Sequence, residues 1–369
     1  MSQLILNDTN KIRKIDRSDM LSFCLNAAHH FRKAKKAAER IVPNFSKPKN
    51  IIVAGMGGSA IGGELLKDLT RDNVKTPIEI NRDYSLPAYA NEKSLVLIIS
   101  YSGETEETLS AFLSAVRNNC MIFCLSSGGD LLNFAEKLGV PYLKVPSGVP
   151  PRAALPYLFV PLLVLAKKIR IVSSASVDLS EALNVLEILS DENSPEKTVN
   201  ENFAKTLALG LDGTVPVAYG YGIFRGVAQR FKTQFNENSK IPSKWEYFSE
   251  LNHNEIEGWE QSGKLAKYFS AIFIRDKYEA NEIRKRIEIT KTLMNSDSKQ
   301  FEVWSKGKSI LARMLSTVYI GDYTSIYLAI LRNIDPTPVY TIGSLKTKIK
   351  LTGTKKKIIG ELRSLIASR

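Results

Sequence analysis

The sequence predicts an α/β protein made of two three-layer αβα domains, each with a mainly parallel sheet of the doubly wound, flavodoxin-like kind. Short apolar runs alternate with amphipathic helical patterns in the first half of the chain, and the same alternation begins again after about residue 200. Continuously apolar strands separated by helices are typical of a parallel sheet that is covered on both faces. At 369 residues the chain is also long enough for two domains with buried cores.

The first half begins with a helical segment over 1–46, whose apolar face includes Met20, Phe23, Ala27 and Phe31. The first αβα domain is expected over 47–172. Its strands are predicted at NIIVAG, PIEIN, LVLIIS, MIFCLS and YLKVP, and its helices at IGGELLKDLTRD and EETLSAFLSAVRN. The apolar run at 153–166 contains two prolines and is too short to span a bilayer, so a buried helix is expected there.

The second half repeats this layout with weaker glycine chemistry. A connecting helix and polar linker are expected over 173–200, and a second αβα domain over 201–335. The strands of the second domain are predicted at VPVAYGY, KYFSAIFIRD and FEVWS, with a helix over 225–234. The last segment, 336–369, is basic and is expected to end in a solvated amphipathic helix; a nucleic-acid surface is less favoured because no aromatic residues interleave with its lysines.

A glycine-rich turn follows the first strand, in NIIVAGMGGSAIGG, and turns of this kind hold phosphate groups. A nucleoside triphosphate is excluded because no Lys-Ser or Lys-Thr pair follows the last glycine. A dinucleotide remains open at this point, because Gly55, Gly57 and Ala60 fit G-x-G-x-x-A, and Glu79 and Asp83 lie roughly where a ribose-binding acid is sought. Within the turn, Gly57, Gly58 and Ser59 are the candidate phosphate-binding residues.

A second loop, SYSGETEET, favours a sugar phosphate over a dinucleotide. It places Ser100, Ser102, Thr105 and Thr108 around Gly103, between a strand and the next helix. One such hydroxyl is expected to be an ordinary helix N-cap. Several of them, together with Ser59, provide neutral donors beside two helix N-termini, which suits a tetrahedral anion.

Through GMGGSAIGG and SYSGETEET the sequence resembles the sugar isomerase (SIS) domain family, and within it the archaeal type of bifunctional phosphoglucose/phosphomannose isomerases. Further stretches carry the resemblance in matching order: PSGVPPRAALPY, NENSK, ELNHNEIEGW and DYTSIYLAILRNIDPTPV. The resemblance covers nearly the whole chain, but the residues after about 351 extend beyond it. It implies two SIS-type domains and interconversion of glucose 6-phosphate or mannose 6-phosphate with fructose 6-phosphate through a cis-enediolate.

The resemblance also implies roles for four residues. Glu237 is the expected base, His253 the expected ring-opening residue, and Arg152 the expected stabiliser of the enediolate, with a share in substrate binding. Lys346 matches a C-terminal active-site lysine, although Lys348 and Lys350 lie nearby and leave room for a register difference of two residues. Aldose–ketose isomerisation needs a base, an acid/base that opens the ring, and positive charge or donors near the oxyanion, all of which side chains can supply. No cofactor and no metal are therefore expected.

Composition narrows the partners and the compartment. The net charge of +13 favours anionic partners, and hexose 6-phosphates are the ones expected, with no nucleic acid and no membrane. Cys24, Cys120 and Cys124 form neither an even disulfide set nor a zinc spacing, and residues 1–20 lack the apolar stretch of a signal peptide. A cytoplasmic protein is expected. The resemblance adds a homodimer in which the histidine reaches the partner's active site.

Three other functions stay open on the sequence. A non-catalytic, sugar-phosphate-binding regulatory SIS protein would keep the serines but has no need of Glu237 and His253. A hexosamine-phosphate synthase would need a nucleophilic cysteine after Met1, where Ser2 stands. A nicotinamide dehydrogenase is suggested only by the short glycine pattern.

Overall fold

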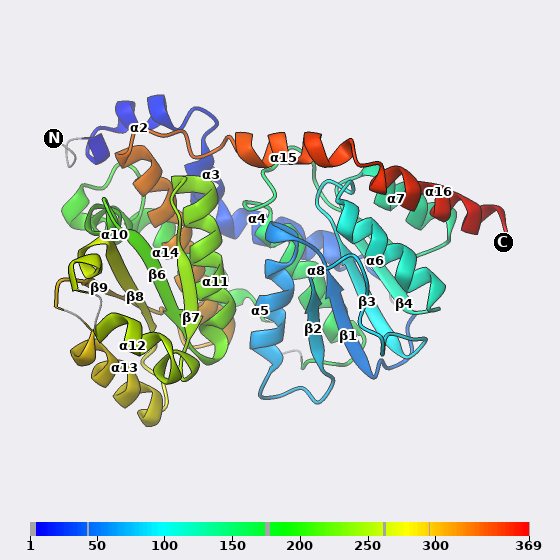
Figure 1. Cartoon of the computed structure of the whole chain (residues 1–369), viewed down its shortest axis with the longest axis horizontal. Coiled ribbons are helices and arrows are strands. Elements are labelled where there is room, and N and C mark those ends of the chain that lie inside the picture. The colour runs from blue at the N-terminus through cyan, green and yellow to red at the C-terminus, as the bar shows by residue number, and fades with distance from the viewer. Residues whose placement is uncertain (1–4, 43, 174–177, 261–262, 295, 369) are drawn as a thin grey trace. The chain divides into compact units, whose positions relative to one another are not determined.

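The structure is a computed structural model that describes residues 5–42, 44–173, 178–260, 263–294 and 296–368. The chain forms two compact units. One unit comprises Met1–Ala28 and Asp178–Pro338, and the other comprises His29–Val177 and Val339–Arg369. Each unit contains one parallel sheet, and we refer to them as the β6 unit and the β1 unit after the first strand of each (Figure 1).

The β1 unit confirms the expected doubly wound sheet. Its strands are β1 (Asn50–Ala54), β2 (Ile78–Asn81), β3 (Ser94–Ile99), β4 (Met121–Ser126) and β5 (Tyr142–Lys144). All neighbours run parallel in the order β2-β1-β3-β4-β5, which is the flavodoxin-like order. All six residues of β3 are buried, as expected for a central strand with helices on both faces.

Helices cover both faces of this sheet. On one face, α5 (Ile61–Thr70) packs against α8 (Leu155–Lys168), the buried helix expected from the apolar run. On the other face, α6 (Glu106–Arg117) and α7 (Gly129–Lys137) enclose a core that includes Ile52, Val96, Ile98 and Cys124. Alternate residues of each strand thus point into separate layers, which gives the three-layer αβα arrangement.

The β6 unit has the same plan. Its strands are β6 (Val215–Gly220), β7 (Lys244–Tyr247), β8 (Phe269–Arg275) and β9 (Lys299–Trp304), all parallel in the order β7-β6-β8-β9. The helices around it are α2 (Thr9–Ile15), α3 (Met20–Leu25), α9 (Ser180–Glu192), α10 (Phe203–Leu211), α11 (Arg225–Gln234), α12 (Glu255–Glu260), α13 (Asn281–Leu293) and α14 (Ile310–Leu331). The strand β7 was not anticipated; its KWEY sequence is short, partly charged and only partly buried, as suits an edge strand.

The helix α14 is the centre of the β6 unit. It is long and apolar enough to cross a membrane, but its apolar stretch is entirely buried inside the structure, and it packs on α9, α10 and α11. Its Asp322 accepts two hydrogen bonds from the buried Arg230 guanidinium, at 2.9 and 2.6 Å. A charged pair that is enclosed in this way is tolerated because both partners are hydrogen-bonded. Helix α14 therefore forms part of the core.

The division into five consecutive segments stays a prediction, but the structure groups the ends of the chain differently. The helices α2 and α3 belong to the β6 unit, whereas most of α4 (Ala27–Ala38) belongs to the β1 unit, so the segment 1–46 is shared between them. The tail forms two helices, α15 (Tyr340–Lys350) and α16 (Thr354–Ala367). Helix α15 has no buried residue, but α16 buries Ile358 and Leu362 against the β1 unit, so the terminal helix is not simply solvated.

Candidate active site

The strand order places the two predicted phosphate-binding loops side by side. After β1 the chain crosses to β2 on one side, then returns to β3 on the other, so β1 and β3 are neighbours at the point where the winding reverses. Loops at the carboxyl ends of such strands diverge and leave a crevice in which ligands bind. The glycine turn follows β1 and SYSGETEET follows β3.

The glycine turn allows close approach of two chain segments. Gly57 has a positive φ of 50°, and residues Gly57–Ser59 form a 3-10 turn that leads into α5. A Cβ at Gly58 would lie 2.8 Å from the carbonyl oxygen of Pro151 and 3.0 Å from the backbone nitrogen of Arg152. Glycine is therefore required for packing the turn against the loop that carries Arg152.

Tyr101 joins the surrounding loops. Its backbone N–H donates to Ser59 Oγ at 3.1 Å, which connects the second loop to the first. Its hydroxyl donates to the carbonyl oxygen of Pro146 at 2.8 Å and accepts from the backbone N–H of Val149 at 2.9 Å. Burial raises the pKa of Tyr101, so its hydroxyl remains a proton donor at neutral pH. The sequence analysis did not single out this residue.

The hydroxyls of the second loop divide into two groups. Ser100 is 1% exposed, and its Oγ accepts from Gly103 N–H at 3.1 Å while donating to Thr105 Oγ1 at 3.0 Å. Both bonds brace the loop from within. Ser102 is exposed and its Oγ accepts from Glu104 N–H at 3.2 Å, so its own proton can be given to a ligand. Thr108 is 1% exposed on the core side of α6 and does not join the cluster.

Thr105 is the N-cap residue of α6, but its side chain makes no capping hydrogen bond. The ordinary cap expected for a single hydroxyl is therefore absent at this position, and the first N–H groups of α6 keep their capacity to bind an anion. Arg152, in the turn before α8, is 3% exposed. The structure thus brings the glycine turn, Ser59, the second loop and the Arg152 backbone together in the β1 unit.

Glu237 lies in the β6 unit, in the π-helical turn Phe235–Ser239 at the end of α11. Turns of this type often occur at functional sites. Neighbouring residues fix the turn: Asn238 Nδ2 donates to Ser325 Oγ at 2.9 Å, and Ser239 Oγ donates to the Ser325 carbonyl at 2.6 Å. Lys240 adopts a positive φ of 56° and donates to the carbonyl oxygen of Glu237. The Glu237 side chain itself is only partly buried.

His253 and Lys346 occupy exposed positions. His253 ends the 3-10 turn Glu250–His253, between β7 and α12 in the β6 unit, and its side chain is open to solvent. Lys346 lies on α15, which belongs to the β1 unit and has exposed or partly exposed residues throughout. Lys348 is on the same helix and equally exposed, so exposure alone does not decide the register. Across the described residues, no group of three or more His, Cys, Asp or Glu is placed to hold a metal ion.

In the second sheet, a cluster of ion pairs lies at the carboxyl end of β8, the strand that neighbours β6. Arg275 at the end of β8 is 2% exposed and bonds to Glu279 at 2.6 Å and Glu288 at 2.6 Å, as well as to Glu302. The next residue, Asp276, pairs with Arg313. Among the described residues at this point, the charged side chains are thus engaged with one another, in line with the weaker glycine chemistry of the second unit.

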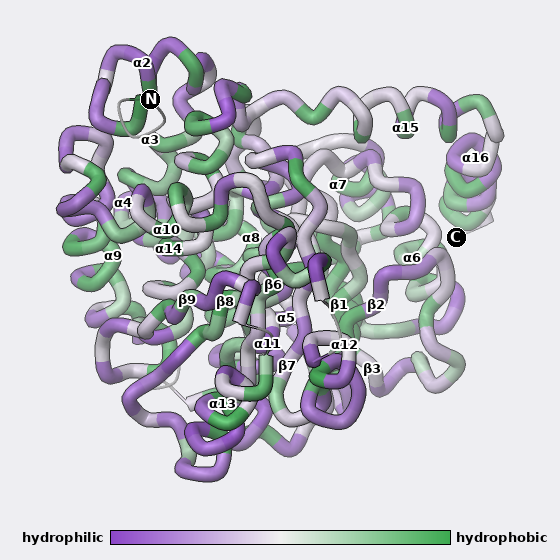
Figure 2. The backbone as a smooth tube through the Cα atoms, turned by 60° about the vertical axis from the view of Figure 1, so that its left-hand side comes forward, coloured by the Kyte–Doolittle hydropathy of each residue, from purple (hydrophilic) through white to green (hydrophobic). Residues whose placement is uncertain are grey.

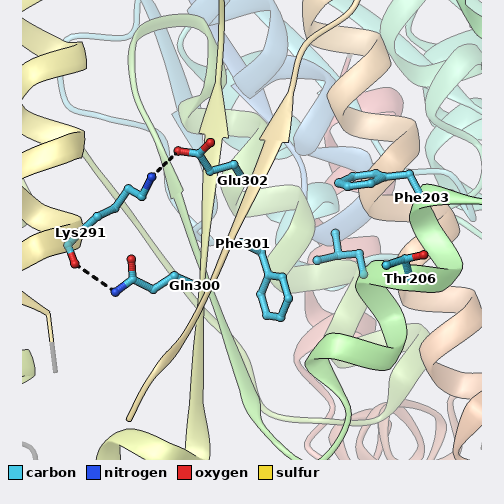
Figure 3. Close-up of a pocket in the computed structure, with 7 residues that line it drawn as sticks. Phe203, Thr206, Lys291, Gln300, Phe301 and Glu302 are labelled. Carbon is cyan, nitrogen blue, oxygen red and sulfur yellow. Dashed lines mark hydrogen bonds and ion pairs between the residues drawn. The ribbon is translucent and has the colours of Figure 1, made fainter. Parts of the chain in front are cut away.

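A pocket of about 360 Å³ opens elsewhere in the β6 unit, between α10 and the edge strand β9. Figure 3 shows the rings of Phe203 and Phe301 on its wall, whereas Lys291 points to Glu302. The Lys291 ammonium donates to Glu302 at 2.8 Å, so the lysine in this lining is already paired. The pocket shares no residue with the predicted sites.

Comparison with known proteins identifies the family. A curated bifunctional phosphoglucose/phosphomannose isomerase of Caldicellulosiruptor bescii is 41% identical over 334 residues, which cover 89% of this chain and 98% of that protein. The chain belongs to the bifunctional phosphoglucose/phosphomannose isomerase family. Another member of the family, from Thermoplasma acidophilum, is 36% identical over 81% of this chain and 89% of that protein. Residues 200–349 also match the family model of the bacterial phospho-glucose isomerase C-terminal SIS domain.

Solved structures confirm the fold of this isomerase-family chain. A hypothetical protein of Thermus thermophilus superposes with a TM-score of 0.70 at 15% identity, covering 93% of this chain and 94% of that one. A putative phosphosugar isomerase of Clostridium difficile gives a TM-score of 0.66 at 14% identity, covering 86% and 95%. At this identity the likeness concerns the fold alone.

Proposed function

We propose that the protein is an isomerase of hexose 6-phosphates that interconverts glucose 6-phosphate or mannose 6-phosphate with fructose 6-phosphate. The observation that carries this proposal is the pair of hydroxyl-bearing loops at the β1–β3 switch point, in a chain that belongs to this family. Exposed Ser102, the first N–H groups of α6, which Thr105 does not cap, and the turn Gly57–Ser59 supply donors that suit a phosphate dianion.

For the chemical step we propose that Glu237 is the base that moves the proton between C1 and C2 through a cis-enediolate. The π-helical turn supports this role because the two residues that follow Glu237 are anchored to Ser325, which fixes the backbone beside a partly exposed carboxylate. Arg152 is the proposed source of positive charge for the enediolate oxygen, since two prolines precede it and its side chain is held in a buried position. The scheme uses side chains alone and needs neither a metal nor a cofactor.

We propose His253 as the ring-opening residue, because a neutral imidazole can exchange a proton with a ring oxygen near pH 7. Lys346 is the proposed cation beside the sugar. Their solvent exposure in one chain agrees with a homodimer in which His253 completes the partner's site. A reducing cytoplasm is the proposed compartment, since Cys24, Cys120 and Cys124 are free thiols.

The test is an assay with fructose 6-phosphate in which glucose 6-phosphate and mannose 6-phosphate are measured separately. Both products are expected. A D-glucosamine-6-phosphate 4-epimerase of Sulfolobus acidocaldarius is 29% identical over 85% of this chain, so glucosamine 6-phosphate should be offered in parallel. Turnover of the amino sugar without turnover of fructose 6-phosphate would refute the proposed isomerase activity and indicate an amino-sugar phosphate as the substrate. Binding of fructose 6-phosphate without any turnover would favour a regulatory protein instead.

A further inference from the structure

Helix α16 lies beyond the residues that match the family model, which end at 349, and it packs against the rest of the β1 unit. It lies next to α6 in both views of the chain (Figures 1 and 2). Ile358 and Leu362 are 6% and 0% exposed within the core that α6 and α7 form. Arg117 of α6 and Glu361 of α16 add an ion pair at 2.7 Å. The helix is thus an integral part of the β1 unit.

Lys355 shares the buried face of α16, because 355, 358 and 362 follow the helical spacing of three and four residues. Its ammonium group pairs with Glu104 and, at 2.8 Å, with Asp130. Its side chain is 19% exposed. Burial lowers the pKa of Lys355, but the bonds to Asp130 and Glu104 outweigh it and raise that pKa, so the lysine is charged at neutral pH.

Glu104 belongs to the second loop, between Gly103 and Thr105. One carboxylate oxygen accepts from the backbone N–H of Asp130 at 2.9 Å, and the other meets Lys355. The Glu104 backbone N–H donates to Ser102 Oγ at 3.2 Å. The side chain of Glu104 is therefore held at both oxygens while its backbone holds the Ser102 hydroxyl.

The loop is also pressed against the start of α7. Gly103 has a φ of 72°, and a Cβ there would lie 1.8 Å from the carbonyl oxygen of Gly128. The carbonyl oxygen of Gly103 accepts from Leu131 N–H at 3.0 Å. Lys355 bridges both sides of this contact, since Glu104 belongs to the loop and Asp130 to the first turn of α7.

We propose that Lys355 is a positioning residue for the phosphate site: it clamps Glu104 to Asp130 and so fixes Ser102 and Thr105 in the geometry that receives the phosphate. The inference rests on the proposed function, because it assigns the phosphate to this loop. Lys355 also neutralises a carboxylate that would otherwise repel the incoming dianion. Helix α16 thereby acquires a role in substrate affinity.

The test compares Lys355→Met with Lys356→Met, which removes the same charge from an exposed neighbouring position on the same helix. In Lys355→Met, KM for fructose 6-phosphate and Kd for inorganic phosphate, measured by calorimetry, should both rise about 2- to 5-fold, within the range for losing a partly exposed ion pair. The value of kcat should stay within about twofold, as expected when binding alone is weakened. Lys355→Arg should restore both affinities, and Lys356→Met should match the wild type.

Wild-type affinities in both Lys355→Met and Lys356→Met would overturn the clamp. Equal losses of affinity in the two variants would also overturn it, because they would indicate general charge attraction instead. A fall in kcat alone would also contradict it. Failure of the proposed function is distinguishable: a wild-type protein that turns over no hexose 6-phosphate refutes the isomerase, whereas the Kd for inorganic phosphate still decides whether Lys355 shapes the site. Unfolding midpoints of the three variants separate local effects on the loop from loss of α16 packing.

Discussion

Gly103 provides a sharp test of how the phosphate loop is packed. In Gly103→Ala the new methyl group would lie 1.8 Å from the carbonyl oxygen of Gly128, and the residue would keep a φ of 72°. The left-handed conformation costs a non-glycine residue about 1–2 kcal/mol. Forcing an atom into a filled space typically costs about 1–3 kcal/mol more. The substitution should therefore lower the free energy of unfolding by about 2–5 kcal/mol.

Gly139→Ala is the matched control, because Gly139 has a φ of 68° but a Cβ added there would meet no atom within 4 Å. It should lose only the conformational part, about 1–2 kcal/mol. Urea unfolding of both variants measures the difference, and the KM for fructose 6-phosphate should rise only in Gly103→Ala, since Ser102 and Thr105 flank the disturbed contact. Equal stability of the two variants would show that the loop does not approach α7 as closely as described.

Three further outcomes are expected. Activity should survive EDTA, because the proposed proton transfer uses side chains alone; loss on chelation and recovery with zinc would contradict that scheme. Inactive Glu237→Gln and His253→Ala proteins, mixed under subunit exchange, should regain activity if the two residues meet across a dimer, and no recovery would refute the shared site. Glu181 accepts from the N–H groups of Ser309 and Lys308 at 2.7 Å each, which lower its pKa. The stabilising effect of the ionised Glu181 is present above about pH 4.3 and is lost as the pH falls through the lowered folded-state pKa. Glu181→Gln should therefore lower the free energy of unfolding at neutral pH and have little effect in strong acid. Equal destabilisation at both pH values would argue against this pH dependence.

The fold was accessible from sequence wherever burial imposed a continuous apolar run. The central strands β1, β3 and β4 are such runs, and the structure confirms all three. The edge strand β7 was not predicted from the sequence, because KWEY carries charge and is partly exposed to solvent. It therefore has neither an apolar run nor a clean alternation of apolar and polar residues. The grouping of α2 and α3 with the β6 unit depends on contacts across more than a hundred residues of sequence, such as Ser190 Oγ of α9 donating to the carbonyl of Leu25 in α3 at 2.8 Å. No local pattern encodes such a contact.

For the phosphate site, residue types indicated the loops but not the task of each hydroxyl. Ser100 and Ser102 are two positions apart and look equivalent in sequence, yet one is buried as a brace and the other is exposed. Both residues follow β3, which ends at Ile99, so strand alternation does not set their directions; Ser100 Oγ is held inward by Gly103 N–H, whereas Ser102 Oγ accepts from Glu104 N–H at the surface. The role of Lys355 could not be predicted from the sequence, because it is one of three consecutive lysines. Only the packing of α16 distinguishes it from its neighbours.

The central claim is that this chain isomerises hexose 6-phosphates with Glu237 as the base, and exchange of the C2 proton of glucose 6-phosphate in D2O tests it most directly. The wild type should form fructose 6-phosphate and mannose 6-phosphate and incorporate deuterium at C2, as followed by proton NMR. Glu237→Gln keeps the size of the side chain and should reduce isomerisation and exchange together by about 10²–10⁴-fold, with glucose 6-phosphate still bound. Isomerisation and exchange at wild-type rates in Glu237→Gln, with both sugars formed, would contradict the assignment of the base.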